Sequence, residues 1–550
     1  MIKTRVKQTI DRCFVTGAEQ GMWSREAEGR YTVEVPKREA QGDFSTNFAM
    51  VVAKTDRCNP RDLAALFVEL LAADPIFTRV EVAGPGFINL FLTRDIWATV
   101  LAPLYTEDEH FGRSNQGSGR RVLVEFVSAN PTGPLSIGHG RNAVLGDAIA
   151  RLLEATGYHV QREYYFNDAG RQMRVLGEST QARYLELLGL PFEFPEDGYQ
   201  GDYIRDIAQS LVAEGGSGFR DADLCVFKER AQQAIFLDID TTLKRIDIGF
   251  DSYFNEHTLY EDGRVKRIVE ELRERGLVYE KEGATWFRTT QFGQGQDRVI
   301  IKSSGEPTYR LPDIAYHDDK FRRGYDWMID VFGSDHIATV PDVLAGVRAL
   351  GHDPDRITVI LYQFVTLLRD GKQVKMSTRK ATFVTVDELV DEVGADAFRF
   401  FLLMRKPDSL IEFDLDLATK QSQENPVYYV QYAHARLCSI ERLAREQGVI
   451  AATPERADLR RLTEPEEFAL LKTLAAYPQL VAGAAADLAP HRVVFYLMEL
   501  AAQFHGFYNR HKVLTADEEL TLARLTLCGG LKRVFRNGLR LIGLTVPERM

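Results

Sequence analysis

A glycine-rich loop that carries one histidine is the first stretch of the chain whose residues could do chemistry. Gly138 and Gly140 flank His139, and from Asn142 onward apolar residues recur at helical spacing. Free N–H groups at the start of such a helix attract an anion, and an imidazole there can donate to charge that develops on a phosphate oxygen. We therefore predict a phosphate site, although the loop matches neither the P-loop pattern nor GxGxxG. The alternative is a glycine turn with a surface histidine.

The elements that must position this loop are a strand before it and a strand after its helix. Residues 122–127 form a nearly continuous apolar run, typical of a strand buried on both faces, and residues 160–166 are a second strand candidate. Gly157 stands between them, where the end of the helix is expected. Strand, loop, helix and strand make one βαβ unit whose helix presents its N-terminus to a ligand.

Length and composition limit the classes of protein that the chain could belong to. Its 550 residues exceed a single core, so we expect three or more domains. A net charge of −11 argues against indiscriminate binding of nucleic acid. Five scattered cysteines without a CxxC pair predict neither a disulfide framework nor a metal site. We see no signal peptide and no apolar run that would span a membrane, and expect a cytoplasmic protein.

Two motifs together resemble the signatures of the class I aminoacyl-tRNA synthetases. PLSIGH (residues 134–139) is similar to HIGH, and VKMSTRK (residues 374–380) resembles the KMSK loop that closes on the phosphates of ATP. SANPTGPLSIGHGRNAVLGD (residues 128–147) resembles the arginyl-tRNA synthetase version of the first motif, and FNDAGRQM resembles that family's NDxGxQ segment. Two departures stand out. Ser136 replaces the first His of HIGH, and Thr378 replaces the second Lys of KMSK.

The resemblance implies a multidomain α/β fold in three parts. Residues 1–112 are expected to form an N-terminal α+β domain that contacts the tRNA D-loop. Residues 113–424 are expected to form a Rossmann-type catalytic domain with a doubly wound parallel sheet, and the KMSK-like loop spans residues 375–380. A charged helical insertion is expected at about residues 170–290, and we assign no chemistry to it. Residues 425–550 resemble the all-α DALR anticodon-binding bundle.

The activity implied by this resemblance is the ATP-dependent ligation of L-arginine to tRNA(Arg). Arginyl-adenylate would form first, and the arginyl group would then pass to the 3′-terminal adenosine. ATP would enter with Mg²⁺ as a substrate, and we expect no protein-bound metal or prosthetic group and a monomer. A synthetase for another amino acid and a catalytically silent tRNA-binding paralogue are the rival interpretations, the second because of Ser136 and Thr378.

The residues expected at the phosphates of ATP come from the two signatures. His139 and Lys375 are the expected catalytic residues, because Lys375 would neutralise charge as pyrophosphate leaves. A solvated basic loop is the alternative for Lys375. The full set expected to bind ATP is Gly138, His139, Gly140, Lys375, Met376 and Ser377.

A buried carboxylate is what the guanidinium of arginine requires, because its planar fork of donors pairs with two carboxylate oxygens. Asp313 is the first choice and Glu125 the second. Asp313 could instead cap a helix over residues 314–321, and Glu125 could pair structurally. In the family, a Gln usually stands where we align His336. The full set expected to bind arginine is Glu125, Ser128, Asn130, His139, Tyr309, Asp313 and His336.

Four residues are candidates for contact with tRNA. Phe44 could stack on an unpaired base and Asn47 could hydrogen-bond one, or they could be a core residue and a helix cap. Tyr429 and Arg436 lie seven residues apart on one helical face and could contact an anticodon base. A basic stretch that favours phosphate contact follows, with Arg524, Lys532, Arg533, Arg536 and Arg540.

Overall fold

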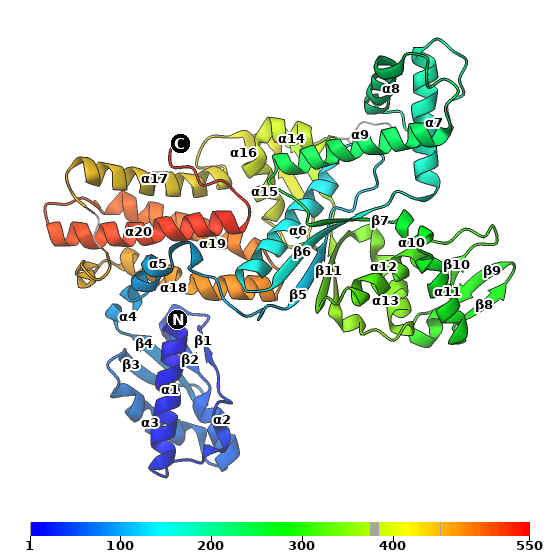
Figure 1. The fold of residues 1–550 in the computed structure, drawn as a ribbon. Coiled ribbons are helices and arrows are strands. Elements are labelled where there is room, and N and C mark those ends of the chain that lie inside the picture. The colour runs from blue at the N-terminus through cyan, green and yellow to red at the C-terminus, as the bar shows by residue number, and fades with distance from the viewer. Residues whose placement is uncertain (1, 375–383, 451–452) are drawn as a thin grey trace.

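The computed structural model describes residues 2–374, 384–450 and 453–550. At its centre lies a five-stranded sheet, and the N-terminal elements and the C-terminal helices lie on the same side of it in Figure 1. All neighbouring strands of this sheet are parallel, in the order β12-β11-β5-β6-β7. The strands are β5 (Arg121–Glu125), β6 (His159–Phe166), β7 (Ser252–Asn255), β11 (Trp327–Gly333) and β12 (Ile357–Tyr362).

The order of the strands makes the sheet doubly wound, as the sequence predicted. The chain runs outward from β5 to β6 and β7, and then returns to the other side of β5 for β11 and β12. Ligands in such sheets bind beyond the carboxyl ends of the strands at this switch point, between β5 and β11. Val122 and Val124 pack in one core and Leu123 in another, so β5 is buried on both faces.

Helices cover both faces of the sheet. α6 (Ile137–Ala155) follows β5, and its buried residues join the same core as Val122 and Val124. On the other side, α12 (Arg310–Arg322) and α13 (Val340–Ala349) flank β11 in the chain and pack on each other. Near α6 lie β13 (Val365–Arg369), β14 (Lys372–Gln373), α14 (Val386–Val393), α15 (Ala395–Leu403), β15 (Ile411–Asp414) and α16 (Leu415–Thr419).

The segment expected as a helical insertion contains one strand of the main sheet. α7 (Gly170–Leu187), α8 (Asp202–Gly215) and α9 (Leu224–Arg245) form a lobe with its own small core, which projects from the molecule in Figure 1. β7 then pairs in parallel with β6, so the sheet continues inside this segment. After it come α10 (His257–Glu261), α11 (Arg264–Glu274) and an antiparallel sheet of β8 (Val278–Lys281), β9 (Ala284–Phe287) and β10 (Arg298–Ile301).

The N-terminal elements form a separate α+β unit. Its antiparallel sheet has the order β1-β2-β4-β3, and aromatic rings such as Phe14, Phe48 and Phe67 fill its core. α5 (Leu101–Glu107) then packs on the C-terminal helix α20 (Glu518–Leu541). The elements are α1 (Ile2–Glu19), β1 (Val33–Glu34), β2 (Phe44–Thr46), α2 (Phe48–Asp56), α3 (Pro60–Ala72), β3 (Phe77–Ala83), β4 (Phe87–Leu92), α4 (Arg94–Ala98) and α5 (Leu101–Glu107).

The C-terminal part is a bundle of four long helices, coloured from dark yellow to red in Figure 1. They are α17 (Pro426–Glu446), α18 (Pro465–Ala486), α19 (His491–Arg510) and α20 (Glu518–Leu541). Among the described residues, α18 is the one helix long and apolar enough to cross a membrane. Its Leu470, Leu471 and Leu474 are fully buried in the bundle, as expected for a core helix.

A buried ion pair joins α6 to α15 and the C-terminal segment. Arg399 of α15 donates to the carboxylate of Asp147 on α6, and both side chains are almost fully buried. The same guanidinium donates to the carbonyl oxygens of Ile246 and Ile542. The pKa of Asp147 is lowered despite its burial, because Arg399 and then Arg151 favour the charged form.

We expect Arg399→Met to lower the free energy of unfolding by about 3–5 kcal/mol, because it removes a buried partner of the Asp147 carboxylate. Urea unfolding followed by circular dichroism measures the loss. Arg369→Met is the matched control, since Arg369 forms an exposed pair with Glu392 that contributes less than about 1 kcal/mol. Equal losses in the two variants would contradict the structural role given to Arg399.

Candidate active site

A cavity of about 550 Å³ opens at the carboxyl edge of the main sheet, at the switch point. Glu125 at the end of β5, Phe332 on β11 and Tyr362 at the end of β12 line it. Of the residues expected to bind arginine, all seven line this cavity: Glu125, Ser128, Asn130, His139, Tyr309, Asp313 and His336.

The loop after β5 is held in an unusual backbone conformation. Val127 has φ 64° and Ser128 has φ 43°, in the left-handed region that a β-branched residue rarely adopts. Asn142 of α6 fixes this loop, because its Oδ1 accepts from the N–H of Val127 at 2.7 Å and its Nδ2 donates to the carbonyl of Val331 at 2.8 Å. One side chain thus bridges β5 and β11 at the switch point.

Ser128 and Asn130 are tied to neighbouring residues of the cavity wall. The hydroxyl of Ser128 donates to Glu125 at 3.1 Å and accepts from the N–H of Tyr165 at 3.1 Å. The amide of Asn130 donates to Gln172, from the NDxGxQ-like segment, at 2.8 Å. Both side chains are therefore positioned before any ligand enters.

His139 lies in the first turn of α6, where the sequence predicts the phosphate site. The backbone N–H of Ser136 points at Nδ1 of His139 at 3.2 Å, and burial lowers the pKa of the imidazole. A Cβ on Gly138 would meet only the Ser136 hydroxyl, so this side of the turn is open. A Cβ on Gly140 would lie 2.5 Å from Phe398, so close packing of α6 on α15 accounts for this glycine.

Asp313 has a carboxylate without a partner. Its side chain is partly buried in the cavity wall, and among the described residues nothing donates to it or forms an ion pair with it. Burial raises the pKa of Asp313 to about 7, helped by the charges of Glu256 and Glu125 and opposed by His317. α12 begins at Arg310, so Asp313 lies within the first turn and does not cap a helix that starts after it.

Glu125 is already paired. Lys320 of α12 is completely buried and donates to Glu125 at 2.6 Å and to Asp330 of β11 at 2.7 Å. His317 reaches the other oxygen of Asp330 at 3.0 Å. Burial raises the pKa of Glu125, whereas Lys320 and His317 lower that of Asp330. Glu125 thus forms the structural ion pair that was the alternative to arginine binding, although its side chain also lines the cavity.

Two further residues of the cavity were missed by the sequence analysis. Glu256 follows β7 directly and is 6% exposed, and burial raises its pKa. The buried hydroxyl of Tyr165 faces the carboxylate of Glu256, and burial, then the charges of Glu256 and Asp313, raise its pKa. The signal for Glu256 was its place just after the aromatic run SYFN, within the segment that we regarded as scaffold.

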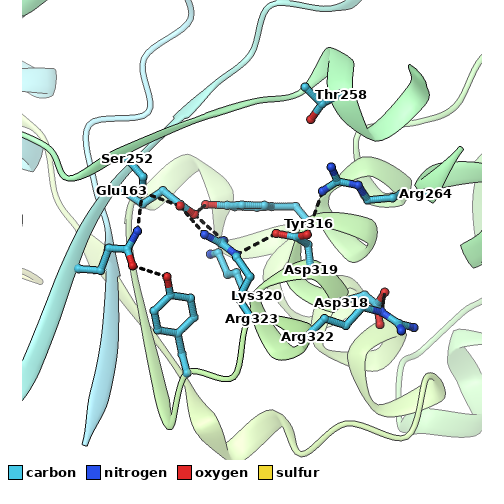
Figure 2. Close-up of polar contacts among 12 residues, drawn as sticks. Glu163, Ser252, Thr258, Arg264, Tyr316, Asp318, Asp319, Lys320, Arg322 and Arg323 are labelled. Carbon is cyan, nitrogen blue, oxygen red and sulfur yellow. Dashed lines mark hydrogen bonds and ion pairs between the residues drawn. The ribbon is translucent and has the colours of Figure 1, made fainter. Parts of the chain in front are cut away.

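A network of polar contacts around Glu163, drawn in Figure 2, holds Tyr316, whose side chain lines the cavity. Glu163 of β6 accepts from both terminal nitrogens of Arg323, at 2.5 and 2.7 Å, and from the hydroxyl of Tyr316 at 2.6 Å. Ser252 donates to the same carboxylate at 2.7 Å. Tyr316 is thereby held against Tyr165, with ring centroids 4.6 Å apart.

Tyr309 and His336 lie at the mouth of the cavity. Tyr309, just before α12, is 71% exposed, and the His336 ring stacks on Phe332 with centroids 5.2 Å apart. Lys375, Met376 and Ser377 fall outside the described residues, as does Thr378. The chain beyond them returns to the first signature, because Thr385 forms a β-bridge with Ser136 and the N–H of Val386 donates to Leu135 at 2.8 Å.

The N-terminal candidates for tRNA contact are engaged inside the fold. Phe44 is 5% exposed and its ring stacks on Trp97, so the core alternative describes it and stacking on a base would require it to leave the core. Asn47 makes no side-chain cap. Its Oδ1 accepts from the N–H of Thr32 at 2.8 Å and so joins the start of α2 to the chain before β1.

Tyr429 and Arg436 lie together between α17 and α19. His505 of α19 contacts both, with 4.6 Å between its ring centroid and that of Tyr429 and 3.0 Å between its Nδ1 and Arg436. Arg436 also lies over the rings of Tyr432 and Tyr508. This cluster is partly exposed, so Tyr429 and Arg436 can be reached from the surface at which the sequence predicts contact with tRNA.

The basic stretch of α20 differs from the expectation. Its five cations are each paired with a carboxylate of this chain: Arg524 with Glu467, Lys532 with Glu441, Arg533 and Arg536 with Asp108, and Arg540 with Glu109. These pairs join the bundle to itself and to the segment after α5. They leave less free positive charge for phosphates than the sequence suggested.

Comparisons with known proteins agree with this geometry. Three family models match: Arginyl tRNA synthetase N terminal domain at residues 1–92, tRNA synthetases class I (R), catalytic domain at residues 101–412, and DALR anticodon binding domain at residues 430–550. The chain is 62% identical to an arginine–tRNA ligase of Desulfotalea psychrophila and 49% identical to one of Syntrophotalea carbinolica, with full coverage of both chains in each case.

Solved structures show the same fold. A putative arginyl-tRNA synthetase from Campylobacter jejuni is similar with a TM-score of 0.77 and 34% identity, over 84% of this chain and all of that one. The Thermus thermophilus arginyl-tRNA synthetase matches over both full lengths with a TM-score of 0.75 and 23% identity. The chain therefore belongs to the arginyl-tRNA synthetases, a family of the class I aminoacyl-tRNA synthetases, and its activity is that of an arginine–tRNA ligase.

Proposed function

We propose that the cavity binds L-arginine with its guanidinium between Asp313 and Glu256. The unpaired carboxylate of Asp313 is the observation that carries this proposal, because leaving a buried acid without a partner costs free energy that a bound cation recovers. Glu256 adds a second carboxylate from the end of β7, and the hydroxyl of Tyr165 beside it has an oxygen that can accept from the guanidinium. Glu125 is less available, because Lys320 already neutralises it.

The carboxylate of arginine would face the start of α6, near Ser128 and Asn130. There it would attack the α-phosphorus of Mg-ATP, and pyrophosphate would leave. Catalysis in this scheme consists of alignment and of charge stabilisation by His139, the N–H groups of α6 and Lys375. Lys375, Met376 and Ser377 remain predictions from the sequence, and no protein-bound metal is required.

The 2′-hydroxyl of the terminal adenosine of tRNA(Arg) would then take the arginyl group. Tyr429 and Arg436 are the proposed contacts to the anticodon, since both are partly exposed on the bundle. As in the family, residues 1–112 would contact the tRNA D-loop, residues 113–424 would carry out catalysis and residues 425–550 would bind the anticodon. The proposal also includes that the protein is a cytoplasmic monomer. Charging of total tRNA with labelled arginine, beside lysine and glutamine, tests the whole scheme.

Removing the carboxylate of Asp313 tests the guanidinium site. We expect Asp313→Asn to raise the KM for arginine about 100-fold, because a charged partner is lost in a partly desolvated site. Discrimination against lysine should fall as well, since it depends on a polar group that only the right substrate satisfies. Asp355→Asn, at an exposed position away from the cavity, is the control. An unchanged KM and unchanged discrimination would remove Asp313 from the site.

The pH dependence of arginine binding follows from the raised pKa of Asp313, about 7 in the free protein. A bound guanidinium favours the ionised acid and lowers this pKa, so binding below pH 7 must release a proton. The affinity for arginine should therefore be constant above pH 7 and fall up to about tenfold per pH unit below it. Calorimetry in buffers of different ionisation enthalpy should find close to one proton released at pH 6 and few at pH 8. A flat profile would contradict the proposal.

His139→Ala and Lys375→Ala should each slow arginylation on the order of 10² to 10³-fold, because each removes one preorganised donor or charge at the phosphates. The KM for arginine should change little, which separates these variants from Asp313→Asn. Initial rates at saturating ATP measure the effect. Normal rates in both variants would overturn the assignment of the phosphate site.

A further inference from the structure

Ser136 is the residue at which this chain departs from the HIGH signature, directly before the first turn of the helix that carries His139. It is the N-cap of α6, with an extended backbone (φ −80°, ψ 167°). In the capping-box arrangement found there, the Ser136 hydroxyl faces the backbone N–H of His139. The imidazole of His139 in turn faces the backbone of Ser136. A histidine thus occupies the position that Glu or Gln takes in the usual capping box.

The contact fixes which ring nitrogen carries the proton. The N–H of Ser136 lies 3.2 Å from Nδ1 of His139, and the Ser136 hydroxyl oxygen lies at the same distance. A backbone N–H is only a donor, so Nδ1 must present its lone pair. In the neutral ring the proton then sits on Nε2, and Nε2–H is the donor left for the cavity that His139 lines.

The surroundings keep this arrangement in place. The backbone at Ser136 is bridged to Thr385, and Leu135 accepts from the N–H of Val386, so the direction of the Ser136 N–H is set by two chain segments. Within the described residues, Asp335 on the short helix over residues 334–338 is the charged side chain that acts on His139, and burial outweighs it and lowers the pKa of the ring.

We propose that Ser136 is a positioning residue that holds His139 as the neutral imidazole with its proton on Nε2, aimed at the phosphates of ATP. The proposal rests on the proposed role of His139 at ATP. It explains how the chain manages without the first histidine of the signature, since the backbone and hydroxyl of a small cap residue orient the second one. A donor with a fixed proton needs no reorganisation when charge develops on the phosphate oxygens.

Ser136→Asp separates this role from simple helix capping. Aspartate caps a helix as well as serine does, so α6 should remain intact. Its carboxylate beside Nδ1 only accepts hydrogen bonds, so it favours a proton on Nδ1 and raises the pKa of His139. We expect kcat at saturating arginine to fall about tenfold or more at neutral pH, with the KM for arginine unchanged, and to become dependent on pH near neutrality. Saturating arginine removes the titration of Asp313 from the measurement.

Ser136→Thr keeps the hydroxyl and should retain the wild-type rate and profile. Asp223→Ala is the control for loss of a cap, because Asp223 caps α9 by accepting from the N–H of Cys225 at 2.8 Å. It should leave the pH profile of kcat unchanged. Ser136→Asp with the rate and profile of the wild type would overturn the proposal and leave Ser136 as a helix cap.

The tautomer itself can be observed without measuring activity. In protein labelled with ¹⁵N-histidine, the resonances absent from His139→Ala belong to His139. We expect Nδ1 of the wild type to show the shift of an unprotonated nitrogen and Nε2 that of an N–H, and Ser136→Asp to change this pattern. A protonated Nδ1 in the wild type would refute the proposal. Normal arginylation by His139→Ala would instead refute the role of His139 on which it rests, so the two failures are distinct.

Discussion

One buried ammonium determines how charge is distributed beneath the active site. Lys320 lies between Glu125 and Asp330, at adjacent positions of β5 and β11, and all three side chains are almost fully buried. Two carboxylates side by side in this environment would otherwise repel and lose their charge. Because Lys320 satisfies these two, Asp313, two turns before it on the same face of α12, is left as the unpaired acid that we propose for the guanidinium. If Asp313 binds the guanidinium as proposed, its free charge depends on Lys320, a residue that need not touch the substrate.

α6 links this site to the rest of the molecule. Its first turn presents His139, its second holds the strained loop after β5 through Asn142, and Asp147 anchors it to α15 through Arg399. Gly140 and Gly146 allow Phe398 and Phe126 to approach the helix closely. A shift of α6 would therefore disturb the phosphate site, the switch point and the contact with the C-terminal segment at the same time.

Ion pairs contribute to the attachment of the outer parts, beside the hydrophobic core that these parts share with the sheet. Asp108 forms ion pairs with Arg533 and Arg536 of α20, and Asp43 of the N-terminal unit forms one with Lys472 of α18. Arg533 and Arg536, which the sequence analysis assigned to phosphate contact, are thus paired within the chain. The contact that we propose for RNA on the bundle is the partly exposed cluster of aromatic rings and Arg436 around Tyr429, where stacking would contribute more than net charge.

The sequence by itself determined the features that depend on neighbouring residues. Local patterns and family motifs predicted the buried strand at 122–127, the turn before His139 and the helical bundle after residue 425, and they singled out Asp313 as the candidate that we propose for arginine. The doubly wound arrangement of the sheet could also be predicted, because parallel strands with helical crossovers allow few strand orders.

Only the tertiary structure decided the pairings between distant segments. The sequence did not show that Lys320 neutralises Glu125, 195 positions away, or that Glu256 reaches the cavity from a segment that looked like scaffold. It left open whether Phe44 stacks on a base or lies in the core, and the structure places its side chain in the core. Burial and ion pairing depend on which surfaces meet in three dimensions, and residue types and spacing along the chain do not contain that information.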